Sequence, residues 1–164
     1  MELVYLGLGS NLAGTLDNPK EQLNKALQTL SEHPKLNDLV CSSFYCTNPI
    51  GPQDQPDYIN AVVRLYTCLP PFDLLDYLQT IESGQERIRD RRWGPRTLDL
   101  DILIYGKLVL NERRLTIPHP RMSERAFVLL PMSEIDPQLV ITDCKTVTDL
   151  LENCLDQRIV KLQK

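Results

Sequence analysis

Two aspartates separated by a single residue, Asp99 and Asp101, are the acidic side chains whose spacing most directly suggests chemistry. They lie in a β-favourable run from Leu98 to Tyr105 that is followed by Gly106. Because successive side chains of a strand point to opposite faces, both carboxylates fall on one face, about 6.6 Å apart along the strand. They could hold one divalent cation or bracket a close pair, as in sites of phosphoryl displacement. The apolar residues predicted to share the opposite face are Leu98, Leu100, Ile102 and Ile104.

A basic segment comes immediately before this strand. Residues 87–96 contain five arginines and only one acidic residue, Asp90, so the segment carries +4 on a chain whose total charge is −4. Arginine guanidinium groups match phosphate oxygens, and Mg²⁺ is bound by carboxylates together with phosphates. The segment and the aspartates together predict a site for a nucleoside triphosphate carried with Mg²⁺. Taken singly, the aspartates could be solvated or ion-paired strand residues, and the arginines an exposed charged loop.

The composition limits the class of protein. A chain of 164 residues with 42% hydrophobic and 24% charged residues predicts one globular domain, residues 1–164, with a sizeable core. No apolar run approaches the length of a membrane span, and the N-terminus lacks a signal-peptide pattern, so we expect a cytoplasmic protein without a membrane partner. The net negative charge disfavours general affinity for nucleic acid. Five scattered cysteines and two histidines indicate neither a disulfide framework nor a zinc site.

The order of periodic segments predicts the fold. Strands are expected over 3–9, 39–47, 58–69 and 98–105, with amphipathic helices beginning at Pro19 and Pro71. This β-α-β-β-α-β order predicts an α+β, ferredoxin-like sandwich. Helices over 126–135 and 146–155, followed by an edge strand over 159–162, form a predicted C-terminal extension.

A second set of side chains could bind a flat heterocycle. Tyr58 and Asn60 alternate with apolar residues, so the aromatic ring and the amide share one face of their strand, where they could stack on and hydrogen-bond a ring system. Gly7 and Gly9, in the first strand, could allow a ligand or another backbone to come close.

Four segments, taken in order, resemble the 6-hydroxymethyl-7,8-dihydropterin pyrophosphokinase family of folate biosynthesis. They are GLGSNL at 7–12, SSFYCTNPIGPQDQPDYINAVV at 42–63, RWGPRTLDLDIL at 92–103 and IPHPRMSERAFVLLPM at 117–132. The third segment is the specific family signature. The resemblance implies transfer of pyrophosphate from ATP to the hydroxymethyl oxygen of the pterin, with release of AMP.

The resemblance also implies roles for individual residues. Two Mg²⁺ ions would be held by Asp99 and Asp101, which would act in catalysis with Arg87 and Arg96. The pterin site would comprise Thr47, Asn48, Ile50, Tyr58, Asn60, Trp93 and Phe127. The nucleotide site would comprise Gln79, Glu82, Arg87, Arg92, Arg96, Ile102, His119 and Arg125. We expect a monomer whose partners are the small molecules ATP and reduced pterin.

Two other functions remain open from the sequence. A ferredoxin-like sheet can bind RNA without catalysis, although the aromatic pattern of such modules is absent. A different Mg²⁺-dependent phosphotransferase could use the same scaffold, since a fold does not fix a function. Nucleotide products distinguish these: AMP indicates pyrophosphoryl transfer, ADP an ordinary kinase, and neither a binding module.

Overall fold

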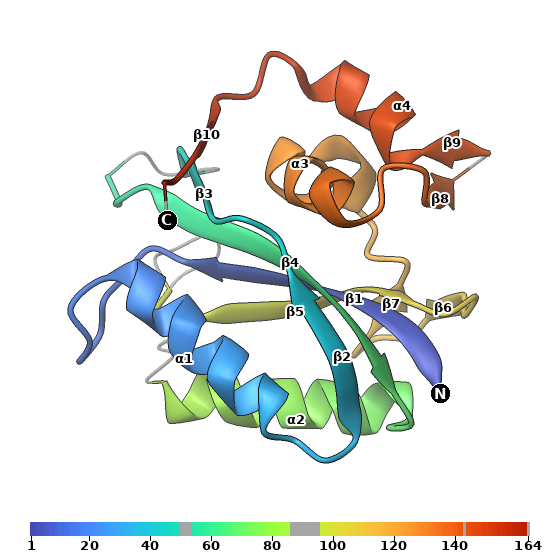
Figure 1. The fold of residues 1–164 in the computed structure, drawn as a ribbon, viewed down its shortest axis with the longest axis horizontal. Helices are drawn as coiled ribbons and strands as arrows, with labels where there is room; N and C mark the ends of the chain where they lie inside the picture. Colours follow the sequence, from blue (N-terminus) through green and yellow to red (C-terminus); the bar gives the residue numbers. More distant parts are fainter. Residues whose placement is uncertain (50–53, 86–95, 143, 164) are drawn as a thin grey trace.

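A six-stranded antiparallel sheet forms the centre of the molecule, with helices on both faces (Figure 1). The computed structural model describes residues 1–49, 54–85, 96–142 and 144–163. Strands follow the order β10-β3-β4-β1-β5, and β2 also pairs with β4. The strands are β1 (Glu2–Ser10), β2 (Leu36–Cys41), β3 (Tyr45–Thr47), β4 (Tyr58–Thr67), β5 (Asp99–Tyr105), β6 (Leu110–Asn111), β7 (Thr116–Ile117), β8 (Val140–Thr142), β9 (Lys145–Thr146) and β10 (Ile159–Lys161). The helices are α1 (Pro19–Ser31), α2 (Pro71–Gly84), α3 (Ala126–Ile135) and α4 (Val147–Leu151), with 3₁₀ turns η1 (Met122–Glu124) and η2 (Glu152–Cys154).

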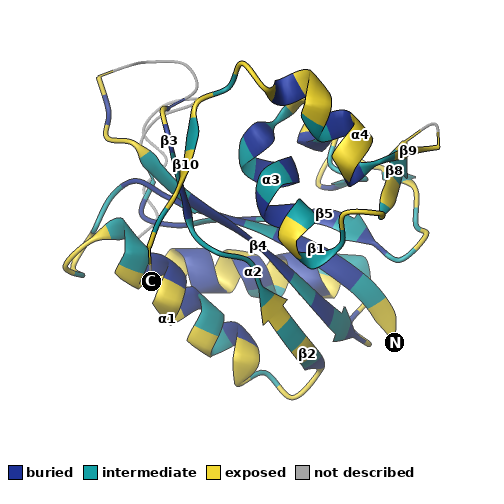
Figure 2. Cartoon of the chain, turned by 45° about the horizontal axis from the view of Figure 1, so that its top comes forward, coloured by how far each residue is buried: buried dark blue, intermediate teal, exposed yellow. Residues whose placement is uncertain are grey.

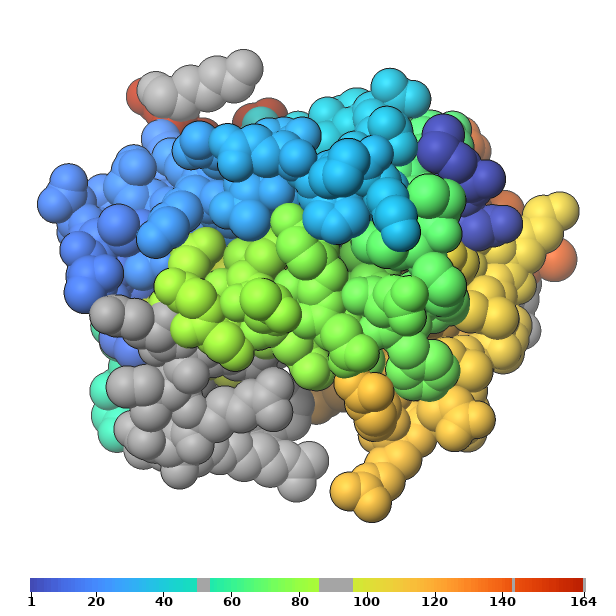
Figure 3. Space-filling model, turned by 90° about the horizontal axis from the view of Figure 1, so that it is seen from below, coloured from blue at the N-terminus to red at the C-terminus, as the bar shows by residue number. Residues whose placement is uncertain are grey.

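Helices α1 and α2 cover one face of the sheet, and their packed side chains hide it from solvent (Figure 3). The predicted start of α1 is confirmed: the Asn18 side chain caps it by accepting a hydrogen bond from the backbone N–H of Glu21 at 3.1 Å. Leu23, Ala26 and Leu30 are fully buried, as their helical spacing predicts. The first helices therefore form where local sequence signals place them.

Helix α3 packs on the opposite face of the sheet, and α4 packs against α3 (Figure 2). Their apolar residues Leu129, Met132 and Val147 form a second core with Tyr5 and Val62 of the sheet. The Thr146 and Asp149 side chains form a reciprocal capping box at the start of α4. The predicted helix over 146–155 is α4 followed by η2.

The regular alternation predicted for the strand carrying the aspartates is wrong at its end. Tyr5 pairs with Ile104 and Leu6 with Ile102, so Leu103 is an extra residue in β5. This bulge turns both Leu103 and Ile104 toward the α3 core, whereas Ile102 lies in the α1–α2 core. The prediction for Leu98, Leu100 and Ile102 is correct, and Asp99 and Asp101 precede the bulge, so their shared face is preserved.

The strand predicted over 39–47 is two strands, β2 and β3, that both pair with β4. Between them Ser42 bonds to Val62 twice: its backbone N–H donates to the carbonyl at 2.9 Å, and its Oγ accepts from the backbone N–H at 3.0 Å. The predicted C-terminal edge strand is confirmed as β10, which pairs with β3. No helix in the described part of the chain is long and apolar enough to cross a membrane.

Candidate active site

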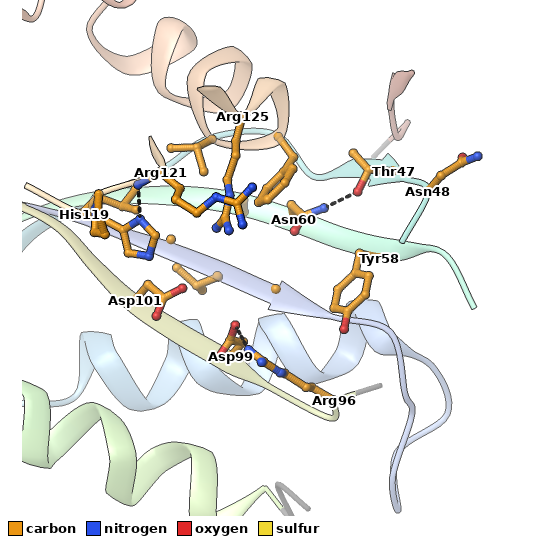
Figure 4. Close-up of a pocket in the computed structure, with 18 residues that line it drawn as sticks. Thr47, Asn48, Tyr58, Asn60, Arg96, Asp99, Asp101, His119, Arg121 and Arg125 are labelled. Atoms are coloured by element: carbon orange, nitrogen blue, oxygen red, sulfur yellow. Dashed lines mark hydrogen bonds and ion pairs between the residues drawn. The ribbon is translucent and has the colours of Figure 1, made fainter. Parts of the chain in front are cut away.

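A cavity of about 350 Å³ opens between the sheet and the start of α3. This volume lies within the range of small-molecule sites. Its walls come from β1, β3, β4, β5, the segment before α3, and α3 itself (Figure 4). The lining residues are Gly7, Leu8, Gly9, Thr47, Asn48, Tyr58, Asn60, Ala61, Arg96, Asp99, Asp101, Leu103, His119, Pro120, Arg121, Arg125, Phe127 and Val128.

Two glycines of the central strand β1 form the floor. Gly9 lies between Asn60 of β4 and Asp99 of β5, and Gly7 pairs with Asp101. Cross-strand partners share a face. The side chains of β4 and β5 therefore stand on either side of a hollow above β1, whose glycines have no side chains. A Cβ on Gly9 would lie 3.2 Å from Oδ1 of Asn60. The two glycines therefore leave this part of the cavity floor without side chains.

Polar and aromatic side chains form one end of the cavity. The Asn60 amide donates from Nδ2 to Oγ1 of Thr47 at 2.8 Å, which fixes the orientation of the amide. The rings of Tyr58 and Phe127 enter the same space from β4 and α3. The guanidinium carbon of Arg125 lies 5.4 Å from the Phe127 ring centroid. A flat ring with hydrogen-bonding edges suits this end.

The two aspartates lie at the other end of the cavity (Figure 4). Asp99 forms an ion pair with Arg96. Arg96 is itself held by Asn11, whose Oδ1 accepts from the Arg96 backbone N–H at 2.8 Å. Burial, and then the charges of Asp99 and Glu82, raise the pKa of Asp101. Among the described residues, Arg96 and Arg125 lower this pKa only in part, and a bound cation would supply further counter-charge.

Cationic and imidazole groups face the aspartates across the cavity. His119, Arg121 and Arg125 enter from the segment that leads into α3 (Figure 4). Burial, and then the charge of Arg125, lower the pKa of His119, so the ring is neutral at pH 7. Its Nδ1 accepts from the backbone N–H of Arg121 at 3.3 Å, which leaves the proton on Nε2 as a donor. These groups are suited to binding phosphate oxygens.

The residues expected at the site divide into three groups. Ten of them line the cavity: Thr47, Asn48, Tyr58, Asn60, Arg96, Asp99, Asp101, His119, Arg125 and Phe127. Three do not line it: Gln79, Glu82 and Ile102. Four lie outside the described residues: Ile50, Arg87, Arg92 and Trp93.

Physical reasons explain the three exceptions. Gln79 is exposed on α2, on the far side of the sheet. Glu82 is buried and accepts a hydrogen bond from the backbone N–H of Leu100 at 2.7 Å, so it anchors α2 to β5. Its charge also raises the pKa of Asp101. The Ile102 side chain packs in the core between the sheet and helices α1 and α2, so it does not face this cavity.

Sequence reasoning missed one charged residue, Arg121, which lines the cavity. It follows the proline-rich turn that carries His119, 20 positions beyond Asp101. The one available signal was a basic residue beside a histidine in a constrained loop. Its relation to the aspartates depends on how this loop meets β5: the His119 backbone N–H donates to the Leu103 carbonyl at 2.9 Å.

The donor set fits Mg²⁺ better than a metal bound by protein alone. In the described part of the chain no three or more His, Cys, Asp or Glu side chains gather to hold a metal. Mg²⁺ usually takes one or two carboxylates and completes its shell with water and substrate phosphates. Asp99 and Asp101, with the raised pKa of Asp101, meet this requirement.

Comparison with known proteins identifies the class. Residues 5–137 match the family described as 7,8-dihydro-6-hydroxymethylpterin-pyrophosphokinase (HPPK). A 2-amino-4-hydroxy-6-hydroxymethyldihydropteridine pyrophosphokinase from Haemophilus influenzae is 48% identical over 162 residues, covering 99% of both chains. Its counterpart from Pseudomonas aeruginosa is 45% identical, covering 99% of this chain and 98% of its own. The chain belongs to the HPPK family.

A solved structure of another HPPK-containing protein has a similar fold. The structure of Plasmodium falciparum HPPK-DHPS with pteroate superposes with a TM-score of 0.67 at 14% identity, covering 98% of this chain. This chain spans 47% of that longer one. The likeness shows a shared mixed fold of helices on an antiparallel sheet.

Proposed function

We propose that the chain transfers the pyrophosphoryl group of ATP to the hydroxymethyl oxygen of 6-hydroxymethyl-7,8-dihydropterin, with AMP as the second product, in folate biosynthesis. The family match and the named relatives support this activity. The observation that carries it in the structure is a single cavity with two ends: one aromatic and amide-lined, the other carrying paired carboxylates opposite basic groups. Such a cavity suits one ligand that is a heterocycle and another that is a polyphosphate.

The pterin would occupy the aromatic end. Phe127 and Tyr58 offer ring faces, and Asn60 is oriented by Thr47 to hydrogen-bond the edge of the heterocycle. Asn48 lies beside Thr47 and would add backbone groups to this edge. Ile50 and Trp93, expected at the same ring, lie outside the described residues and remain predictions.

The triphosphate would lie toward the aspartates. Arg96, Arg121 and Arg125 provide charge-assisted donors, and His119 offers its Nε2–H. Arg87 and Arg92 remain predictions for the same anion because they lie outside the described residues. We propose that Asp99 and Asp101 hold two Mg²⁺ ions; bound Mg²⁺ would neutralise charge on the phosphate oxygens during transfer.

The chemistry needs positioning more than covalent help from the protein. The hydroxymethyl oxygen forms a bond to the β-phosphorus, and the bond from that phosphorus to the α–β bridging oxygen breaks. AMP leaves with the electron pair, and the hydroxyl proton is released. One cavity that holds both the pterin and the triphosphate brings the hydroxymethyl oxygen, the β-phosphorus and the bridging oxygen into line. This positioning supplies much of the rate enhancement. We assign no side chain as general base.

The architecture supports three further proposals. Strand order β5-β1-β4 followed by β2 and β3, with α1 and α2 on one face, is consistent with a ferredoxin-like βαββαβ unit plus a C-terminal extension. We propose that residues 1–164 form a single domain that acts as a monomer, because one chain supplies every described wall of the cavity. We also propose a cytoplasmic location.

Product analysis tests the function. The protein is incubated with ATP, Mg²⁺ and the reduced pterin, and the nucleotides are separated. AMP formed in equal amount to pterin pyrophosphate is the expected result. ADP would instead indicate transfer of a single phosphoryl group. Unchanged ATP would indicate a binding module without catalytic activity.

A further inference from the structure

One carboxylate remote from the cavity joins three separate segments. Glu134, near the end of α3, accepts from the backbone N–H of Ser43 at 2.6 Å and from the Tyr45 hydroxyl at 2.8 Å. It also forms an ion pair with Lys161 of β10. Burial alone would raise its pKa, but the hydrogen bonds from Lys161, Ser43 and Tyr45 lower it to about 2. The carboxylate therefore stays ionised with its donors in place throughout the neutral range.

Strand β3 links this carboxylate to the cavity. Tyr45 is 3% exposed and is the direct cross-strand partner of Asn60. Partners in an antiparallel pair share a face, so the buried Tyr45 side chain stands beside the Asn60 amide. Asn60 in turn donates to Thr47, two residues beyond Tyr45. Fixing the Tyr45 hydroxyl thus fixes the strand that orients both hydrogen-bonding groups at the aromatic end.

Helix α3 carries both the tie and a wall of the cavity. Phe127, which lines the cavity, precedes Glu134 by seven residues, or two helical turns, so the two side chains project from the same side of α3. The bonds from Glu134 to β3 therefore act, together with the apolar contacts of α3 on the sheet, on the spacing between the Phe127 ring and the amide of Asn60. That distance decides whether a flat ring fits between them.

The C-terminal strand completes the arrangement. In β10, Ile159 pairs with Thr47 and Lys161 with Tyr45, and the Leu162 backbone N–H donates to the Phe44 carbonyl at 2.8 Å. This strand lies beyond residues 5–137, the part that matches the family. Strand β3 has three residues. Without β10, one edge of this short strand would be unpaired.

We propose that Glu134 is a positioning residue for the heterocycle site: with Tyr45 and Lys161 it holds β3 against α3, so that Thr47 and Asn60 meet the pterin in a fixed geometry. This inference rests on the proposed function, because it takes the pterin as the ligand of that end. Glu134 touches neither substrate. Its effect is on the affinity for pterin and not on the transfer step or on ATP.

The test compares Glu134→Ala and Tyr45→Phe with the wild-type protein. Pterin and a non-hydrolysable ATP analogue are titrated separately, and steady-state kinetics follow. Both variants should weaken pterin binding about tenfold, which corresponds to about 1.4 kcal/mol, and raise the pterin KM by a similar factor. The affinity for the ATP analogue and kcat should stay within about twofold. Glu134→Gln, which keeps an oxygen acceptor, should recover most of the affinity.

Asp76→Asn is the matched control, because Asp76 also forms a carboxylate ion pair, with Arg114, but on the exposed side of α2. It should leave both affinities unchanged. Tyr45→Phe keeps the buried ring, so it provides a folded variant even if Glu134→Ala unfolds.

Three results would overturn the inference. Unchanged pterin affinity in Tyr45→Phe, even with a lower Tm, would show a tie that only stabilises the fold. Equal losses for pterin and the ATP analogue would show a general loosening of the cavity. If Glu134→Gln does not recover pterin affinity, the oxygen acceptor at position 134 does not position the site. A wild-type protein that binds no pterin would contradict the proposed function instead, and this is seen before any variant is compared.

Discussion

Replacing Asp101 by asparagine should stabilise the ligand-free protein while abolishing turnover. Burial, and then the charges of Asp99 and Glu82, raise the pKa of Asp101 from 3.8 to about 7. Between these values the folded protein binds more protons than the unfolded chain, so the free energy of unfolding falls as pH rises. Above pH 7 the carboxylate is ionised, and it then lowers the free energy of unfolding by the full amount that corresponds to this pKa difference.

The magnitude follows from the same pKa difference. A difference of about three in pKa corresponds to about 4 kcal/mol, since each unit is worth about 1.4 kcal/mol. Part of this cost is repulsion by Asp99 and Glu82, which counter-ions entering the open cavity screen, so we expect about 2 kcal/mol. For a chain of 164 residues this raises the Tm by about 4–8 °C.

The assay is thermal unfolding at pH 8 in EDTA, repeated at pH 5. Asp101→Asn should melt above the wild-type protein at pH 8, and the difference should shrink at pH 5, where the wild-type carboxyl is protonated. Turnover should fall by several orders of magnitude because the phosphates and Mg²⁺ lose a ligand. Glu112→Gln is the control, since Glu112 is exposed on the β6–β7 hairpin, and its Tm should not change. A variant that melts at or below the wild-type temperature at pH 8 would refute the reasoning.

Three further predictions concern the walls of the cavity. Phe127→Ala should weaken pterin binding by about 1–3 kcal/mol, the scale of stacking on a base, and leave ATP binding unchanged in separate titrations; equal losses would argue against stacking. Gly9→Ala places a Cβ 3.2 Å from Oδ1 of Asn60, so pterin affinity should fall with little change in Tm, and unaltered affinity would show that the floor is not used. The His119 imidazole should titrate below its usual pKa of 6.5 because of burial and then the charge of Arg125, so stability that depends on the neutral ring is lost as pH falls; an NMR titration midpoint above 6.5 would contradict this.

Much of the fold and of the chemistry was predictable from local patterns. The shared face of Asp99 and Asp101 follows from the two-residue repeat of a strand, and the repeat holds because the bulge comes only after Ile102. The start of α1 follows from the Asn18 cap and the proline after it. These features involve residues within a few positions of one another, so their geometry is set by backbone stereochemistry and is readable in the sequence.

The tertiary structure decided the features that depend on contacts distant in sequence. Glu82, expected to bind nucleotide, bonds to the backbone of Leu100, 18 positions away. Arg121 reaches the cavity because its loop pairs with β5. Glu134 meets Ser43 across 91 positions. No short-range repeat encodes such pairings, because they depend on the register of the strands and on the angle at which α3 crosses the sheet. The sequence by itself determined which side chains could share a face; packing determined which of those faces enclose the cavity.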